Sequence, residues 1–394
     1  MKKILSLFLA IVLVCGCCLA FASCGGKDPA EVKAALICLH GDSSTYDKNF
    51  IDAFKTACAN KGITNYNIVT DIPEGNGCYE KAADYADQGY DVIFADSFGH
   101  EPYMIQAAEE FEDTQFCHAT GTKAHTQNQA NFQNAFAAIY EGRYLAGVAA
   151  GLKLIEMYGE DITDAEAKIG YVGAHPYAEV ISGYTSFFLG VRSVVANATM
   201  EVRYTNSWYD EPGEKATAEA LIDAGCKLIS QHADSMGAPT ACEERNIPNV
   251  SYNGTTGKST FVIASRINWT PYFEYMLDCV IKGEDIKADY VGTVEDGSVV
   301  VTAVGPAAAQ GTQAKIDAVA AELKAGTRKV FDCSKFTVKG ATLTEYLADV
   351  VDDGTFTGET NVIKTEGGIT YFAESEFRSA PYFDIIIDGI SVVD

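Results

Sequence analysis

Residues 198–234, ATMEVRYTNSWYDEPGEKATAEALIDAGCKLISQHAD, decide the fold class of this chain. Their pattern predicts a strand over 200–205, a polar and aromatic loop over 206–210, a helix over about 211–224 and a strand over 226–231. A strand, a crossover helix and a second strand form a β-α-β unit, which is the building block of a parallel sheet. We therefore expect an α/β fold.

Three residues mark the limits of the helix in this unit. Asp210 offers an N-cap, because its carboxylate can accept hydrogen bonds from the free N–H groups of the first turn. Pro212 suits the first turn, where its missing N–H is not needed. Gly225 ends the helix, because glycine readily adopts the left-handed conformation found after helices.

Aromatic and polar side chains follow both strands of the unit. Trp208, Tyr209 and Asp210 come after the first strand, and His232 and Asp234 come after the second. Ligands of such sheets collect at the carboxyl ends of the strands. A flat aromatic surface beside short hydrogen-bonding side chains suits a planar, polar, ring-shaped small molecule. The alternative is that Trp208 and Tyr209 only cover the core while Asp210 only caps the helix.

Composition limits the classes of partner. The chain has 394 residues and a formal net charge of −25, and 47% of its residues are hydrophobic. It is long enough to bury a large core or two cores. We expect no nucleic-acid partner, because binding phosphate requires clustered Lys and Arg. The cysteines after residue 30 are dispersed without a C-x-x-C pair, and the histidines are dispersed too, so we expect no metal and no other cofactor.

The N-terminus carries an export signal. A basic start, an apolar run and small residues precede Cys24, and the sequence there resembles a bacterial lipobox. This predicts a signal peptide over 1–23 and a lipidated tether over 24–32, with Cys24 as the lipid-bearing residue. The alternative is an uncleaved anchor, because residues 4–23 suffice, at about 20 residues, to cross a bilayer. In either case the folded part lies outside the cytoplasm and is tethered to the membrane.

Strand and helix patterns alternate in two series, over 33–119 and over 168–252. Each series is long enough for its own domain. Between them, the polar stretch 121–129 is predicted to be a first crossover and residues 132–154 a long helix. A strand over 261–267 and a helix follow the second series.

We therefore expect two doubly wound lobes, joined by several crossovers around a central cleft. Lobe 1 is predicted to comprise 33–121 plus about 254–290, and lobe 2 to comprise 122–253 plus about 291–331. A β-rich C-terminal extension is predicted over 332–394, with a patch on the second lobe as its simplest interpretation. Two such lobes close on a ligand, because the ligand contacts both halves only in the closed state.

Short motifs in both predicted lobes carry a family resemblance. They are FADSFG (94–99), FCHATG (116–121), YEGRY (140–144), EV (179–180), SWYD (207–210) and QHADS (231–235). With these motifs the chain resembles the basic membrane lipoprotein family, the substrate-binding lipoproteins of ABC importers related to the purine nucleoside receptor of spirochaetes. The resemblance covers about 33–331. It implies a type I periplasmic-binding-protein fold, an ABC permease as partner and a purine ligand.

The resemblance also implies how a purine would be held. The family sandwiches the base between aromatic rings, and Tyr46 sits at the position of one of them, with Asp47 beside it. The nucleoside-binding branch holds the ribose with a lysine, and Ser265 falls near that position here. Together with the Trp208 loop and Trp269, this favours the branch that binds a free base.

The expected ligand-binding residues lie at strand ends and helix starts that would face the cleft. They are Tyr46, Asp47, Ser97, Phe98, Glu179, Trp208, Tyr209, Asp210, His232, Asp234, Asn253 and Trp269. Several of them have a structural alternative: Asp210 and Asp234 as helix caps, Glu179 as a surface acid, Tyr46 as a packing residue at a helix start, and Trp269 as a residue between lobes.

The sequence thus predicts an extracytoplasmic, lipid-anchored, monomeric substrate-binding protein of an ABC importer, with a purine base or nucleoside as ligand. We expect no enzymatic activity, because no nucleophile elbow or phosphate-binding loop is present. Two alternatives stay open. One is a ligand-sensing lipoprotein that signals to a membrane receptor. The other is an exported nucleoside hydrolase, which would need Asp42, Asp47, Asp96 and Asp210 to gather around Ca²⁺.

Overall fold

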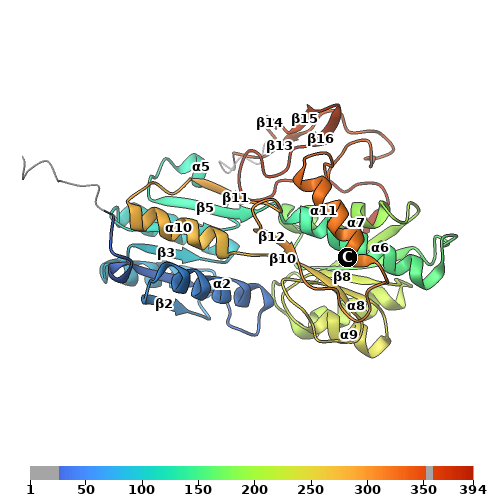
Figure 1. Ribbon diagram of the computed structural model, residues 1–394, viewed down its shortest axis with the longest axis horizontal. Helices are drawn as coiled ribbons and strands as arrows, with labels where there is room; N and C mark the ends of the chain where they lie inside the picture. The colour runs from blue at the N-terminus through green and yellow to red at the C-terminus, as the bar shows by residue number, and fades with distance from the viewer. Residues whose placement is uncertain (1–25, 352–357, 394) are drawn as a thin grey trace, which may run out of the picture.

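The computed structural model describes residues 26–351 and 358–393, which form two α/β lobes and a C-terminal extension (Figure 1). The predicted signal peptide and Cys24 lie outside the described residues. Within the described part, no helix combines the length and the apolar character needed to cross a membrane.

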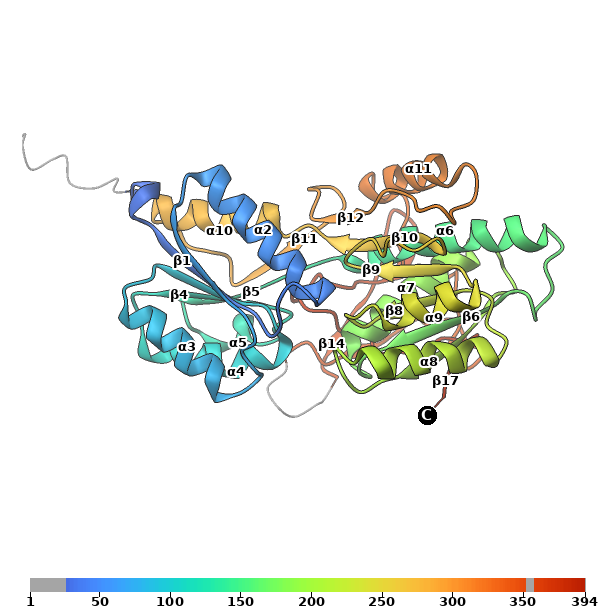
Figure 2. The same cartoon turned by 90° about the horizontal axis from the view of Figure 1, so that it is seen from below.

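The first lobe is a six-stranded parallel sheet with helices on both faces. Its strand order is β11-β5-β4-β3-β1-β2. One face is covered by α2 and α10, and the other by α3 and α4, so two separate apolar layers flank the sheet (Figure 2). The bounds are β1 Lys33–Ile37, α2 Thr45–Lys61, β2 Asn65–Val69, α3 Asn76–Asp87, β3 Val92–Ala95, α4 Glu101–Glu110, β4 Gln115–Ala119, α5 Ala124–Gln127, β5 Phe132–Ala137, α10 Thr270–Lys282 and β11 Asp289–Gly292.

The second lobe is a seven-stranded sheet in the order β12-β10-β9-β8-β6-β7-β17. Its neighbouring strands are parallel except for the pair of β10 and β12. The bounds are α6 Ile139–Tyr158, β6 Lys168–Gly173, α7 Ala178–Arg192, β7 Thr199–Tyr204, α8 Glu211–Asp223, β8 Ile229–His232, α9 Gly237–Arg245, β9 Asn249–Tyr252, β10 Phe261–Ile267, β12 Val299–Val301, α11 Thr312–Lys324 and β17 Ile390–Val392.

The β-α-β unit in residues 198–234 forms as predicted, as β7, α8 and β8. Asp210 caps α8, since its carboxylate accepts the N–H of Gly213 at 3.1 Å. Gly225 follows the helix with φ of 93°, a conformation that suits glycine. The predicted α/β fold class is confirmed by these two parallel sheets, each covered by helices.

The prediction of one helix over 132–154 is wrong in its first part. Residues 132–137 form the strand β5, and α6 begins only at Ile139. All six residues of β5 are buried. A short run buried on both faces shows no period of its own, so its apolar pattern fits a helix as well as a strand.

The limits of the lobes also differ from the expectation, because strand pairing between distant segments decides which lobe each strand joins. Strand β5 pairs with β4 in the first sheet, although the second lobe was expected to start at 122. Strand β10 pairs with β9 in the second sheet, although 254–290 was expected in the first lobe. The chain therefore passes between the lobes after β5, after β10 and after β11, and 121–129 is not a crossover.

The described residues of the C-terminal extension form four short strands before β17, and these pair in two small sheets separate from those of the lobes. They are β13 Leu347–Ala348, β14 Thr360–Asn361, β15 Ile363–Glu366 and β16 Ile369–Phe372. Phe383 stacks on Phe331 with ring centroids 4.4 Å apart, which fixes the extension to the rest of the core. Figure 1 shows the extension above the junction of the lobes.

Candidate ligand-binding site

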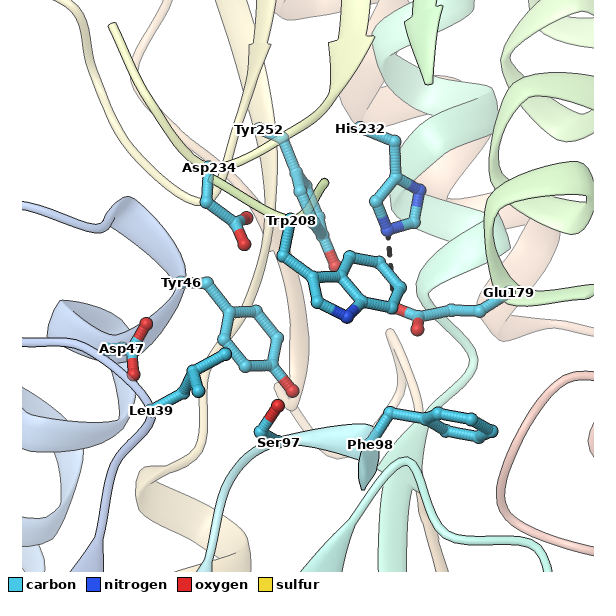
Figure 3. Close-up of a pocket in the computed structure, with 10 residues that line it drawn as sticks. All are labelled: Leu39, Tyr46, Asp47, Ser97, Phe98, Glu179, Trp208, His232, Asp234 and Tyr252. Atoms are coloured by element: carbon cyan, nitrogen blue, oxygen red, sulfur yellow. Dashed lines mark hydrogen bonds and ion pairs between the residues drawn. The ribbon is translucent and has the colours of Figure 1, made fainter. Parts of the chain in front are cut away.

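A pocket lies between the two lobes, where strands β1 and β3 of the first sheet face β8 and β9 of the second (Figure 3). The space inside it that no atom fills, open solvent included, is about 370 Å³. The lining residues are Leu39, Tyr46, Asp47, Ser97, Phe98, Glu179, Trp208, His232, Asp234 and Tyr252.

The lobes touch each other around this pocket. The N–H and the hydroxyl of Thr45 donate to the carbonyl of Asp234 at 3.1 and 3.2 Å. Asn49 donates from its side chain to the carbonyl of Ile267 at 2.5 Å. The pocket is therefore in the closed arrangement that a two-lobed binding protein adopts around its ligand.

Tyr46, in the first turn of α2, brings an aromatic ring into the pocket from the first lobe. Its hydroxyl donates to the carbonyl of Asp96 at 2.8 Å, and its ring lies 4.9 Å from that of Phe50. Burial and the charge of Glu179 hold the pKa of Tyr46 well above its usual value. The ring is thus fixed in place and neutral, as a stacking wall requires.

Trp208, on the loop after β7, supplies an aromatic ring from the second lobe. It packs edge to face on His175, with ring centroids 4.8 Å apart, and lies 6.0 Å from Tyr177. Its carbonyl accepts the N–H of Asp234 at 3.0 Å, which ties the loops after β7 and β8 together. In Figure 3 the indole and the Tyr46 ring reach into the same space from opposite lobes.

The carboxyl group of Asp234 points into the space beside these two rings (Figure 3). Asp234 is 6% exposed, and none of the described residues donates a hydrogen bond to its carboxyl oxygens. Burial, followed by the charges of Asp47 and Glu214, raises the pKa of Asp234 well above its usual value. A buried carboxylate without donors is unfavourable, so this position suits a ligand that brings N–H groups.

His232 and Glu179 form a pair at the other side of the pocket. His232 Nε2 lies 3.3 Å from Glu179 Oε1. Burial and the nearby charge of Arg143 lower the pKa of His232, so the ring is neutral at pH 7. A neutral imidazole and a carboxylate form a polar end to an otherwise aromatic pocket.

Arg143, on α6, lies behind the pocket wall. It is 1% exposed, its Nη1 donates to the carbonyl of Gln231 at 2.8 Å, and its guanidinium lies 3.5 Å from the ring centroid of Tyr252. The pocket lining itself holds three carboxyl groups and, within the described chain, no Lys or Arg. The pocket is therefore acidic, which disfavours an anionic ligand.

Asp47, Asp96 and Cys38 meet just below the pocket floor, with possible ligand atoms within 4.8 Å of one another. Asp47 accepts the N–H of His40 at 2.7 Å, and Asp96 accepts that of Leu39 at 3.1 Å. Burial and the charge of Asp47 raise the pKa of Asp96 well above its usual value. A protonated Asp96 is compatible with this close pair, and the two side chains together fix the loop after β1.

The family model described as ABC transporter substrate-binding protein, PnrA-like, matches residues 42–319. The chain belongs to this family, the basic membrane lipoproteins. The family consists of binding proteins rather than enzymes, in agreement with the prediction for this chain.

Three curated relatives of this chain have names that state a ligand. The "Putative ABC transporter glucose-binding protein TsgA13" of Haloferax volcanii is 34% identical over 57% of this chain and 55% of its own length. A "Purine-binding protein" of Brucella abortus is 33% identical over 55% of this chain and 59% of its own length. The "ABC transporter nucleoside-binding protein BmpA" of Lactococcus lactis is 23% identical over 60% of this chain and 66% of its own length. The chain thus spans little more than half the length of the first two.

Solved structures support the fold. An ABC transporter solute-binding protein from Conexibacter woesei matches with a TM-score of 0.61 at 20% identity, over 76% of this chain and 98% of its own. A solute-binding protein of an ABC transporter from Aeropyrum pernix matches with a TM-score of 0.63 at 13% identity, over 76% of this chain and 93% of its own. The predicted periplasmic-binding-protein architecture is confirmed.

Most of the site residues predicted for this basic membrane lipoprotein come together in the pocket, although their contact with a ligand stays a prediction. Those that line it are Tyr46, Asp47, Ser97, Phe98, Glu179, Trp208, His232 and Asp234. Ser97 is held by Glu74, to which its hydroxyl donates at 2.6 Å. Phe98 is 38% exposed and faces Tyr177 across the mouth of the pocket, with ring centroids 5.5 Å apart.

Four predicted residues do not line the pocket. Asp210 is an exposed helix cap, and Tyr209 packs on His40 outside the lining. Trp269 is 1% exposed and stacks on Phe50 with centroids 4.3 Å apart, so it belongs to the core of the first lobe.

The fourth is Asn253, whose N–H donates to the carbonyl of Ser265 at 2.9 Å. Its backbone has φ of 63°, a left-handed conformation, directly after β9. Ser265 itself is buried on β10 and does not line the pocket either. The sequence analysis missed Leu39 and Tyr252, which end predicted strands at the cleft and could have been found by that position alone.

Proposed function

We propose that this chain is the ligand-binding component of an ABC importer and that it binds a purine, as a free base or a nucleoside, between its lobes. The observation that carries the proposal is the set of Tyr46, Trp208 and Asp234 around one space (Figure 3). The two rings, one from each lobe, suit the faces of a flat heterocycle, and the carboxyl group suits its ring or exocyclic N–H groups.

The relatives point to two ligand classes, and the pocket favours one of them. The Brucella and Lactococcus relatives are named for purine and nucleoside binding, and the Haloferax relative for glucose. A sugar offers hydroxyl groups and needs several donors as well as acceptors. The lining instead has three carboxyl groups and an aromatic surface, which fits a planar molecule rich in N–H donors.

The cellular setting belongs to the same proposal. The chain is exported, lipidated at Cys24 and held at the outer side of the membrane as a monomer, where it delivers its ligand to an ABC permease. The export signal in the sequence and the membership of a substrate-binding family support this. A lipoprotein that reports its ligand to a membrane receptor would use the same closed lobes and remains the alternative.

Titration calorimetry tests the ligand class. The panel is adenine, guanine, hypoxanthine, adenosine, inosine and glucose, with product analysis of each mixture. Tight binding of a purine without turnover supports the proposal, and the preferred form distinguishes base from nucleoside. Binding of glucose alone would replace purine with sugar. Release of free base from a nucleoside would make the protein a hydrolase and overturn the proposal.

A further inference from the structure

The C-terminal extension, here residues 332–351 and 358–393, lies beyond the family match, which ends at residue 319. It nevertheless contacts both lobes beside the cleft. It is therefore a feature of this chain that the family's binding mechanism does not explain.

The extension is held most firmly by the second lobe. Its strand β17 extends the second sheet by pairing in parallel with β7. Arg192 of α7 donates to the carbonyl of Asp388 at 3.0 Å, and the hydroxyl of Tyr140 on α6 donates to the carbonyl of Glu374 at 3.3 Å. Because a strand ladder and these bonds join them, the extension and the second lobe move as one body.

Among the described residues, a polar contact joins the extension to the first lobe. The N–H and the hydroxyl of Ser379 both donate to Asp289 Oδ1 of β11, at 2.8 and 2.6 Å. His125 of α5 lies 3.3 Å from the other oxygen of Asp289, and its Nε2 lies 3.1 Å from the carbonyl of Val350. This contact is polar and local, so it can break without exposing a large apolar surface.

The loop that carries Ser379 is rigid. The buried guanidinium of Arg378 donates to the carbonyls of Val350, Ala380 and Pro381 at 3.1 to 3.2 Å. Three carbonyls bound to one planar cation fix the loop before it meets the first lobe, so little conformational entropy is lost when the contact forms.

The extension also forms one wall of a second cavity, a vestibule next to the candidate pocket. The space in it that no atom fills, open solvent included, is about 1,150 Å³. It is bounded by residues of both lobes and of the extension, among them Phe98, Thr120, Tyr177, Glu179 and Tyr382. Phe98 and Glu179 line the pocket as well, so the vestibule adjoins it.

We propose that the C-terminal extension is a clasp on the binding cleft. It is carried by the second lobe, engages the first lobe through Ser379 and Asp289, and slows both the opening of the lobes and the exchange of ligand through the vestibule. A rotation of the lobes that separates the extension from β11 must break this contact. Only the ligand-exchange part rests on the proposed function.

Two serines of the extension provide a matched test in the full chain. Ser379→Ala removes a hydroxyl that reaches the first lobe, whereas Ser391→Ala removes one that donates to Met200 within the second lobe at 3.3 Å. Asp289→Ala removes the shared acceptor entirely. Spin labels on unnatural amino acids at the exposed positions Lys55 of α2 and Ala216 of α8 report the distance between the lobes without ligand.

We expect Ser379→Ala and Asp289→Ala to increase the population with a long distance between the labels, and Ser391→Ala to leave it unchanged. Dissociation of adenine, followed by tryptophan fluorescence, should become about tenfold faster in Asp289→Ala. Identical distance distributions in all three variants would overturn the clasp. If none of the purine bases and nucleosides of the calorimetry panel binds, the purine proposal fails, and the label distances still decide the clasp. If Asp289→Ala does not fold, Ser379→Ala decides it.

Discussion

The guanidinium of Arg143 lies 3.5 Å from the ring centroid of Tyr252, and only Tyr252 of the two lines the pocket. A buried cation thus supports an aromatic wall from behind. The Nε and Nη2 atoms of Arg143 have no hydrogen-bond partner among the described residues. The Tyr252 ring and the surrounding charges therefore stabilise the guanidinium. The same charge lowers the pKa of His232 and opposes the rise in the pKa of Asp234.

Arg143→Met removes this charge while filling a similar volume. We expect the pKa of His232 to rise, and ligand affinity to fall by about 1–2 kcal/mol because Tyr252 loses its support. Histidine resonances followed by NMR against pH measure the first effect, and calorimetry measures the second. Arg143→Lys serves as the control, since it keeps the charge but not the planar stack. An unchanged His232 titration in Arg143→Met would contradict this account.

Trp208 and Trp269 are the two tryptophans of the chain, and their roles separate cleanly. Trp208→Ala should weaken ligand binding by about 2–4 kcal/mol, as for loss of a buried anchor, with little effect on stability. Trp269→Ala should lower the free energy of unfolding by about 3–5 kcal/mol, because Trp269 fills the core beside Phe50. Calorimetry and denaturant unfolding of both variants are the measurements. Unchanged affinity in Trp208→Ala would remove that ring from the site.

Glu374 makes stability depend on pH. Burial raises the pKa of this carboxyl group from 4.5 to about 8. A carboxyl group with a raised pKa binds more protons in the folded state than in the unfolded state between these values. Stability therefore falls as pH rises from about 4.5 to about 8. Glu374→Gln should remove this loss and raise stability at pH 8 by a few kcal/mol, on the order of the pKa shift.

Denaturant unfolding at several pH values measures this effect. Glu345→Gln is the control, because Glu345 is an exposed residue of the same extension. An equal pH dependence of stability in Glu374→Gln and in the unchanged protein would show that another group titrates.

Ligand binding should not depend on divalent metal. Asp47 and Asp96 lie together, but Asp210 caps α8 at the surface, so the acidic cluster that a Ca²⁺-dependent hydrolase needs is not assembled from these residues. Calorimetry in the presence and absence of a chelator measures this. Loss of binding in the chelator would make the cluster of Cys38, Asp47 and Asp96 a metal site.

The parts of the site that could be predicted are those that follow from strand ends. Trp208 lies in the loop after β7 and His232 is the last residue of β8, and the carboxyl ends of such parallel strands meet at one edge. Tyr46 at the start of a helix was placed by its family resemblance. The same reasoning failed where a side chain had a local partner. Asp210 is used by its own helix, and Trp269 turns into the core because its large apolar surface packs there against Phe50.

The fold could be predicted where periodicity was clear and not where burial was complete. The unit of β7, α8 and β8 has capping residues and an amphipathic helix, and it was predicted within a few residues. Strand β5 is buried on both faces and continues almost directly into α6, so no change of period marks the boundary. Which lobe each strand joins depends on pairing between distant segments, which local pattern does not reveal.

The pairing of β17 with β7 has a consequence for folding. Ile390 lies opposite Met200, so about 190 residues of chain must be synthesised before β7 acquires this neighbour. Until then β7 is an open edge with unpaired backbone groups, able to bind a strand of another chain. Contacts so distant in sequence form slowly. The newly made chain therefore passes through a period in which its second lobe is vulnerable to aggregation, and the pairing of β17 with β7 ends this period.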